Sequence, residues 1–302
     1  MKIKRSKGEV VFDTVNVILM LIVIVITLYP LWYVLISSLS TPTAVQEGKT
    51  MFLPVFAKGQ LFNFAAYKEA FEYQNGLIKY AYGNTILYAG VGTIISMLLS
   101  VLGAYPLSKK RLKGRMFFTM VMLVSMWFNA GMIPTYLNLK NLGFEDSRVG
   151  IMIGFALSAF YVVLIRTYFE SISDSLEESA KMDGANDLTI LFKIYLPLSV
   201  PALMTVGLYY FVDKWNAYLW SSILFKTDKK MPLQVILKKL VVDRQASSES
   251  VANMDSSVLG GGTSSETVIY ATIMLAVIPM LVIYPFVQKF FVKGIMVGSV
   301  KG

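Results

Sequence analysis

Long uncharged stretches alternate with short charged segments along the whole chain. Six of these stretches contain no aspartate, glutamate, lysine or arginine and are mostly apolar. A helix needs about 20 apolar residues to cross the hydrocarbon of a bilayer. The pattern therefore predicts an all-α membrane protein. Its six transmembrane helices are expected at about residues 13–38, 81–108, 116–137, 149–168, 195–219 and 267–289.

The first stretch follows a basic segment, as the apolar part of a secretory signal peptide would. It contains no small-residue cleavage site, and its uncharged run is longer than a signal peptide needs. We therefore interpret it as a retained helix. A further apolar piece, residues 215–225, is too short to cross a bilayer. It is expected either to extend the fifth helix or to lie in the membrane interface.

Basic residues indicate which side of the membrane the loops face. Four of the first seven residues are lysine or arginine, and five more lie in SKKRLKGR at residues 108–115. Short cytoplasmic flanks carry an excess of these residues, so we expect both termini to be cytoplasmic. The predicted organisation is a cytoplasmic N-terminus over 1–12 and a transmembrane domain over 13–302. Within that domain we expect cytoplasmic helices at 174–196 and an extracellular loop at 226–266.

The amino-acid composition removes several kinds of chemistry. Of the 302 residues, 55% are hydrophobic and 16% are charged, and the chain has neither cysteine nor histidine. The mean hydropathy of +0.59 agrees with a membrane protein. Without thiols or imidazoles, disulfides and a Ser-His-Asp triad are impossible and few metal sites remain. The composition thus argues against a metal site or a haem cofactor. The net charge of +9 is interpreted as a topology signal, so no nucleic-acid partner is expected.

A charged segment around residues 174–196 separates two of the apolar stretches. Ser175 and Glu178 have the spacing of a capping box, which predicts the start of a helix there. Gly184 suits the left-handed turn that follows a helix, and Asp187 is placed to cap a second helix. Pro197 predicts a boundary at the residue before it. The segment is thus expected to form two short helices lying across the membrane face.

The charge of this segment bears on its surroundings. Between residues 171 and 195 there are five acidic and two basic residues, so anionic lipid would repel it. A soluble partner with basic residues around an apolar groove would accept it. A solvated connecting loop is the other reading, and the residues alone leave both open.

The stretch EESAKMDGANDLTILFKIYLP resembles the EAA motif of ABC-importer permeases. Glu178-Ser179-Ala180, Gly184 and the Leu196-Pro197 pair keep every spacing of that motif, with serine in place of its middle alanine. The stretches NTILYAGVGTIISMLLSVLGAYPLSKKRLKGR and VIPMLVIYPFVQKFFVKGIMVGSVKG resemble MalG-like sugar permeases. WFNAGMIPTYLNLKNLG is similar to their LplC/YtcP-type branch. The resemblance covers roughly residues 10 to 302.

This resemblance implies a type I ABC-importer permease fold in a bacterial plasma membrane. It implies a heterodimer with a second permease subunit, two copies of an ABC ATPase beneath it and an extracellular solute-binding protein. The implied substrates are oligosaccharides or polysaccharide fragments, and ATP hydrolysis falls to the partner subunits. The motif glutamate, Glu178, is expected to contact a basic ATPase residue, and the tail over 294–302 to reach toward the ATPases. The residues expected to couple to the ATPase are Glu178, Ser179, Ala180, Asp183, Gly184, Ala185, Leu196 and Pro197.

Polar and aromatic residues on the predicted helix faces are candidates for lining a substrate pathway. Packing and interface anchoring are the alternative roles for each of them. The candidates are Asn84, Tyr88, Trp127, Asn129, Tyr136, Tyr209 and Tyr210.

The predicted outer loop at 226–266 is longer than a plain connection requires. Leu233, Ile236, Leu237 and Leu240 recur at helical spacing, which predicts an amphipathic helix. The following polar, Ser- and Gly-rich part is expected to be mobile when alone. The resemblance implies that residues 247–265 reach the binding protein, and a disordered spacer is the alternative. The expected contacts are Met254, Leu259, Gly260 and Gly261, although LGGGTSSE also suits a flexible linker and lacks the lysine of a phosphate-binding loop.

Three other functions are alternatives to an oligosaccharide permease. A permease for a non-carbohydrate solute shares every feature above. A membrane-embedded enzyme would need acids or nucleophiles at membrane depth. The one close charged pair of the predicted helices, Asp213 and Lys214, is expected near the outer interface as a structural ion pair. An ion channel would need a charged ring or a filter-like loop, and the sequence has no sign of either.

Overall fold

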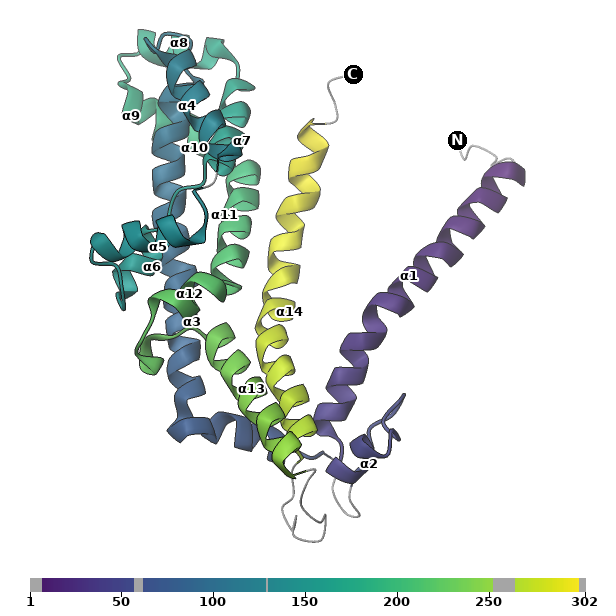
Figure 1. The fold of residues 1–302 in the computed structure, drawn as a ribbon. Helices are drawn as coiled ribbons and strands as arrows, with labels where there is room; N and C mark the ends of the chain where they lie inside the picture. The colour runs from purple at the N-terminus through teal and green to yellow at the C-terminus, as the bar shows by residue number, and fades with distance from the viewer. Residues whose placement is uncertain (1–6, 57–61, 129, 252–263, 299–302) are drawn as a thin grey trace. The chain divides into compact units, whose positions relative to one another are not determined.

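The structure is a computed structural model that describes residues 7–56, 62–128, 130–251 and 264–298, and every regular element in these ranges is a helix (Figure 1). The chain divides into two compact units. The first unit comprises residues 1–75 and 237–278, and the second comprises 76–236 and 279–302. In chain order the helices are α1 (Lys7–Leu39), α2 (Pro42–Gln46), α3 (Ala65–Ser108), α4 (Arg115–Trp127), α5 (Met132–Asn141), α6 (Arg148–Ile153), α7 (Ala159–Glu170), α8 (Asp174–Met182), α9 (Asp187–Ile190), the π-helical turn η1 (Leu191–Tyr195), α10 (Leu196–Leu198), α11 (Val200–Trp215), α12 (Leu219–Leu224), the 3-10 turn η2 (Asp228–Lys230), α13 (Leu233–Val251) and α14 (Ser265–Gly298).

Three helices in the described residues are long and apolar enough to cross a membrane. They are α1, α3 and the Glu266–Pro285 part of α14. Two more candidate spans are bent helix pairs. One pair is α4 with α5, and the other joins Asp187–Leu198 to α11 through a bend of 83°. The all-helical membrane class is thus confirmed, whereas the described helices supply three to five candidate spans and not the six predicted.

The prediction of one spanning helix over 149–168 is wrong. This stretch contains α6 and α7, separated by residues 154–158. Gly154 ends α6 and Ser158 takes an extended conformation before α7, both of which are residue types that disfavour a helix interior. With 12 residues, α7 is about 18 Å long, which is short of a ~30 Å hydrocarbon layer.

Other helix boundaries also differ from the predicted ones. α1 begins at Lys7, before the predicted start, and α3 begins at Ala65. Charged residues can continue a helix beyond the membrane, so an uncharged window underestimates helix length. The fifth predicted helix does not extend through 219, because α11 ends at Trp215 and the separate helix α12 follows.

The first unit is held by polar and aromatic contacts between α1, α3, α13 and α14. The Ser38 hydroxyl lies 2.7 Å from the Tyr67 hydroxyl, and Arg244 forms an ion pair with Glu69. Tyr33 and Tyr270 pack edge to face with ring centroids 5.7 Å apart. The predicted helix in the outer loop is confirmed as α13, and its backbone remains helical to Val251 within the stretch predicted to be mobile.

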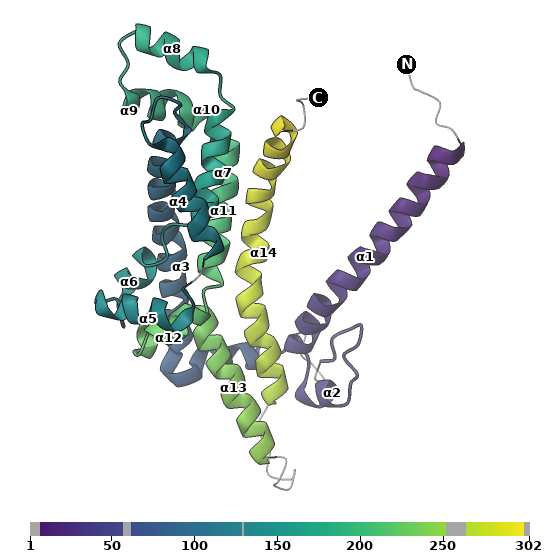
Figure 2. The ribbon, with the colours of Figure 1, turned by 45° about the horizontal axis from the view of Figure 1, so that its top comes forward.

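In the second unit, α3, α4, α7 and α11 run beside one another, and both views place α8 and α9 at one end of this bundle (Figures 1 and 2). A buried cluster at this end joins Tyr105 of α3, Phe169 of α7 and Tyr195 of η1, whose rings meet edge to face. Farther along, the Ser100 and Tyr210 hydroxyls lie 2.7 Å apart and link α3 to α11. These contacts fix the frame that carries α8 and α9.

Asp146, in the loop between α5 and α6, holds the segment that follows α12. Its carboxylate accepts hydrogen bonds from the backbone N–H groups of Lys226 and Thr227, each at 3.1 Å, and from Lys230 Nζ at 2.7 Å. The hydrogen bond from Lys230 keeps the pKa of Asp146 well below its usual range. The residue has φ of 49°, a conformation that aspartate and asparagine tolerate better than most residues.

Replacing Asp146 by alanine tests this contact. The change removes the carboxylate and leaves the Lys230 ammonium without it, so we expect the free energy of unfolding to fall by about 2 kcal/mol. Thermal unfolding of the detergent-purified protein measures the loss. Asp146→Asn keeps one acceptor and tolerates the same φ, so its Tm should fall less. If the alanine variant has the Tm of the intact protein, other contacts hold the segment.

Candidate functional site

The helices α8 and α9 form the loop that the sequence singled out, and we call residues 171–199 the α8–α9 loop. Two short helices were predicted here, and two are present. The predicted cap is wrong by two residues, since Ser173 rather than Ser175 caps α8. The Ser173 hydroxyl accepts a 3.4 Å hydrogen bond from the Ser175 N–H, which places Ser175 inside the first turn.

The turn between the two helices follows the prediction at Gly184. This residue has φ of +81°, which glycine adopts without steric cost. The adjacent Ala185 N–H donates to the Ala180 carbonyl at 2.9 Å and closes the end of α8. The cap of α9 is Asn186, whose side-chain oxygen accepts from the Thr189 N–H at 2.8 Å. The predicted cap Asp187 is wrong, because its carboxylate is paired with Arg111.

Pro197 does not end the helix as predicted. The chain remains helical from α9 through η1 and α10, and the bend comes at Ser199. In η1 the Leu196 N–H donates to the Leu191 carbonyl, a wider i to i+5 turn than that of an α-helix. Pro197 lies in the first turn of α10, where a missing N–H is tolerated.

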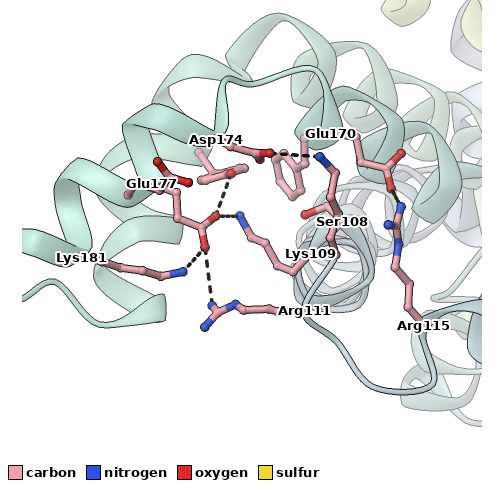
Figure 3. A pocket seen from close by; sticks show the side chains of 12 residues that line it. Ser108, Lys109, Arg111, Arg115, Glu170, Asp174, Glu177 and Lys181 are labelled. Atoms are coloured by element: carbon pink, nitrogen blue, oxygen red, sulfur yellow. Dashed lines mark hydrogen bonds and ion pairs between the residues drawn. The ribbon is translucent and has the colours of Figure 1, made fainter.

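Glu177 anchors the α8–α9 loop to the basic loop after α3. This glutamate is 7% exposed. Its Oε2 accepts hydrogen bonds from Lys109 Nζ and, at 3.1 Å, from the Tyr195 hydroxyl. Its Oε1 accepts from Lys181 and lies 3.7 Å from an Arg111 nitrogen (Figure 3). We call these five residues the Glu177 cluster.

Electrostatics favour the ionised form of Glu177 at neutral pH. Burial alone would raise the pKa of the Glu177 carboxyl, but the hydrogen bonds from Lys109 and Lys181 outweigh it and lower that pKa to about 2. Burial lowers the pKa of Lys109, against the opposing effect of its bond to Glu177. The Lys109 ammonium also lies over the rings of Tyr195 and Tyr105, at 3.5 and 4.4 Å from their centroids. Glu177 is therefore ionised at neutral pH, and Lys109 has one carboxylate and two ring faces that favour its charged form.

Weaker pairs surround this cluster along the same two loops. Lys110 pairs with Asp174 at 3.1 Å, and Arg111 pairs with Asp187. These side chains are largely exposed, so each pair adds little stability on its own. From the sequence, the basic loop is recognisable only as a topology signal, and its pairing with Glu177 is not predicted. The signal available was an acidic and a basic segment predicted on the same side of the membrane.

The motif glutamate itself points outward. Glu178 is exposed, and its side chain has no ion pair or hydrogen bond within the described part of the chain. Leu176, Met182 and Leu188 expose 45%, 89% and 60% of their surfaces. Of the other residues expected to couple to the ATPase, Ser179, Asp183, Gly184 and Pro197 are exposed, whereas Ala180, Ala185 and Leu196 are partly buried and pack on the core. The exposed set remains available to a partner.

Candidate pathway residues lie in several places. Asn84 is 5% exposed and donates hydrogen bonds to the carbonyls of Lys229 and Met231, so it holds the backbone of this segment in place. Tyr88 likewise donates to the Lys230 carbonyl at 2.7 Å. Trp127, at the end of α4, is 85% exposed. The Tyr136 hydroxyl donates to Glu145 at 2.7 Å.

Tyr209 and Tyr210 lie together with Tyr161 of α7. Tyr161 stacks with Tyr209 at a centroid distance of 5.9 Å and meets Tyr210 edge to face at 4.5 Å. The structural ion pair expected between Asp213 and Lys214 is not formed. Asp213 accepts from the Tyr161 hydroxyl at 2.7 Å, and Lys214 donates to the Phe155 carbonyl at 3.4 Å.

Several predicted positions lie outside the described residues. They are Asn129, Met254, Leu259, Gly260 and Gly261, together with the end of the C-terminal tail at 299–302. Their assigned roles stay predictions.

Residues 116–297 match the family described as "Binding-protein-dependent transport system inner membrane component". This match includes the whole α8–α9 loop and more than half of the chain. The chain belongs to this family. It is therefore a multi-pass protein of a bacterial plasma membrane and a permease component of an ABC transport system.

Individual relatives support the same membership over nearly the full length. The chain is 36% identical over 295 residues to "Polygalacturonan/rhamnogalacturonan transport system permease protein YtcP" of Bacillus subtilis (strain 168), with 96% of this chain and 98% of the relative covered. It is 32% identical over 298 residues to "Protein LplC" of the same organism, covering 99% and 97%. The predicted resemblance to the LplC/YtcP-type branch is confirmed.

A solved structure resembles the fold as well. It is described as "Crystal structure of a bacterial ABC transporter involved in the import of the acidic polysaccharide alginate". One of its chains superposes with a TM-score of 0.84 at 42% identity, covering 96% of this chain and all of that chain.

Removing the charge of Glu177 should destabilise the permease. Glu177→Gln leaves Lys109 buried without its counterion, and breaking such a buried pair costs about 3 kcal/mol. We expect a lower Tm for the purified protein. Glu178→Gln is the matched control, because the neighbouring glutamate is exposed, and it should change stability by less than about 0.5 kcal/mol. Equal shifts for the two variants would contradict the assignment.

The same comparison can be followed with pH. The pKa of Glu177 is lowered from 4.5 to about 2, so its stabilisation is complete above pH 4.5 and declines as the pH falls toward 2. The Tm difference between the intact protein and Glu177→Gln should therefore be constant near neutral pH. It should shrink below about pH 4.5.

Proposed function

We propose that this chain is a permease subunit of an ABC importer for acidic oligosaccharides. In this proposal the exposed part of the α8–α9 loop docks on a partner ATPase, and closure of the ATPases moves the loop. The observation that carries the proposal is the contrast between two adjacent glutamates. Glu177 is buried among Lys109, Arg111 and Lys181, whereas Glu178 is exposed beside apolar side chains.

This arrangement suits a mechanical coupling element. A loop that transmits force must be fixed firmly to the membrane helices and still offer a surface to its partner. The Glu177 cluster and the packing of Leu191 and Tyr195 in the core support the first requirement. Exposed Leu176, Met182 and Glu178 support the second, because an apolar contact with one charge fits a groove that has a basic residue.

The proposed assembly has four kinds of subunit. The chain pairs with a second permease to form a heterodimer, two copies of an ABC ATPase bind on the cytoplasmic side, and an extracellular solute-binding protein delivers the substrate. ATP is hydrolysed by the ATPases, and this chain supplies no catalytic group. The resemblance of its loop to the EAA motif and its family membership support this composition.

Acidic oligosaccharides are the proposed substrates because of the named substrates of its relatives. One relative is named for polygalacturonan and rhamnogalacturonan, and the solved relative is described with the acidic polysaccharide alginate. These polymers share sugar units that carry a carboxylate.

A non-carbohydrate solute is the second candidate, and uptake by the reconstituted complex separates the two. Proteoliposomes that contain all partner subunits should accumulate labelled trigalacturonate in the presence of ATP. Absence of carbohydrate uptake would contradict the proposed substrate.

The docking role of Glu178 is tested by charge reversal. Glu178→Lys places a positive charge where a basic ATPase residue is expected, so ATP-dependent uptake should fall at least tenfold, an effect of about 1.4 kcal/mol. Membrane insertion should be unchanged, because an exposed loop acid contributes little to it. An acidic substitution of the facing ATPase residue should restore uptake.

A second variant tests the turn independently. Gly184→Val forces a β-branched side chain to adopt φ of +81°, so it should distort the loop and also lower uptake.

Normal uptake by the Glu178→Lys complex would rule out the docking role.

A further inference from the structure

A pocket in the second unit lies away from the Glu177 cluster. Its volume is about 420 Å³, within the range of small-molecule sites, about 300–1,000 Å³. Its walls come from α6, α7, α11 and α12 and the segments between them. The sequence placed only Tyr210 of its lining residues among the pathway candidates.

Aromatic rings form much of the wall. Tyr161 and Tyr210 meet edge to face at 4.5 Å, and Phe155 lies against Trp220 with centroids 5.0 Å apart. Aromatic faces carry partial negative charge and attract the C–H groups on the apolar side of a sugar ring. The wall thus offers surfaces of the kind on which a pyranose ring can lie.

Two opposite charges face this pocket without pairing to each other. Asp213 uses Oδ2 to accept from Tyr161 at 2.7 Å, and its Oδ1 has no hydrogen-bond partner within the described part of the chain. Among the described residues, Lys214 Nζ has one long hydrogen bond, 3.4 Å to the Phe155 carbonyl. An ammonium has three donors, so two remain for a ligand. Both side chains come from the last turn of α11 and line the pocket.

The position of Lys214 is fixed from behind by α3. A Cβ added at Gly92 would lie 2.9 Å from Lys214 Cδ and 3.2 Å from its Cε. The lysine stem therefore passes over a helix surface that only glycine leaves free. The contact with α3 at Gly92 and the attachment to α11 together fix the direction of the Lys214 ammonium.

We infer that this pocket binds a uronate unit of the transported oligosaccharide, with the sugar carboxylate on Lys214, ring hydroxyls on Asp213 and the ring against Tyr161 and Trp220. The inference rests on the proposed function and names the group that recognises its substrate. A neutral sugar would satisfy Asp213 but leave the lysine without an anion. A phosphate dianion would meet the repulsion of Asp213. A monoanionic, hydroxyl-rich ring satisfies both charges.

Direct binding to the permease complex tests the site. The complex is placed in nanodiscs without the binding protein and titrated with trigalacturonate and with its neutral methyl ester, with tryptophan fluorescence as the readout. The intact complex should bind trigalacturonate more tightly, and Trp220→Phe should remove the ligand-dependent signal. Lys214→Gln should weaken trigalacturonate binding about tenfold, the loss of one charge-assisted contact, and leave the methyl ester unchanged. Lys214→Arg should retain the preference.

Two glycine variants on α3 provide a matched pair. Gly92→Ala displaces the Lys214 stem and should weaken binding of trigalacturonate but not of the ester. Gly90→Ala has no atom within 4 Å of the added Cβ and should change neither. Subunit assembly and basal ATPase activity report folding in every variant.

The outcomes separate the two proposals. If the reconstituted complex transports trigalacturonate but Lys214→Gln binds both ligands like the intact protein, the uronate site is wrong and the proposed function stands. Equal weakening for both ligands, or no saturable binding at millimolar concentrations, also overturns the site. If the complex transports no carbohydrate, the proposed function and the site both fail.

Discussion

The structure of the α8–α9 loop depends on one buried carboxylate. Glu177 is surrounded by Lys109, Arg111, Lys181 and the Tyr195 hydroxyl, so its charge is compensated in a place where water is nearly excluded. An isolated carboxylate would be expensive there. Because the compensating groups come from the loop after α3, from α8 itself and from η1, satisfying Glu177 requires all three segments to be in place together.

As a result, adjacent residues of the α8–α9 loop have different surroundings. Glu177 is engaged inside the protein, whereas Glu178 is exposed and has no ion pair or hydrogen bond within the residues that the structure describes. The aromatic cluster of Tyr105, Phe169 and Tyr195 extends the fixed region into the bundle. A displacement imposed on α8 is therefore expected to pass into the end of α3, because the ion cluster and the core resist independent movement of the two.

The sequence predicted the helical membrane class, the two loop helices, the turn at Gly184 and the helix α13, because each depends on local pattern or on a fixed motif. The predicted N-caps of α8 and α9 are each wrong by one or two residues, because neighbouring residues also have side chains that can cap a helix. For α9, the pairing of Asp187 with Arg111 leaves Asn186 as the cap. The break over 154–158 was missed because an uncharged window does not show where a helix ends. Glu177 and the pocket beside Lys214 depend on contacts between distant segments, which no spacing reveals.

We expect the α8–α9 loop to move as one body with the end of α3. The chain has no cysteine, so Met182→Cys and Lys113→Cys introduce the only two labelling sites in it. Pulsed electron–electron double resonance then measures the distance between two spin labels at these positions in the complete transporter, first without nucleotide and then with ATP bound. If the two segments move together, the distance distribution is narrow, is the same in both states and broadens when Glu177→Gln is added. A distance that changes on ATP binding, or a distribution unaffected by Glu177→Gln, would contradict it.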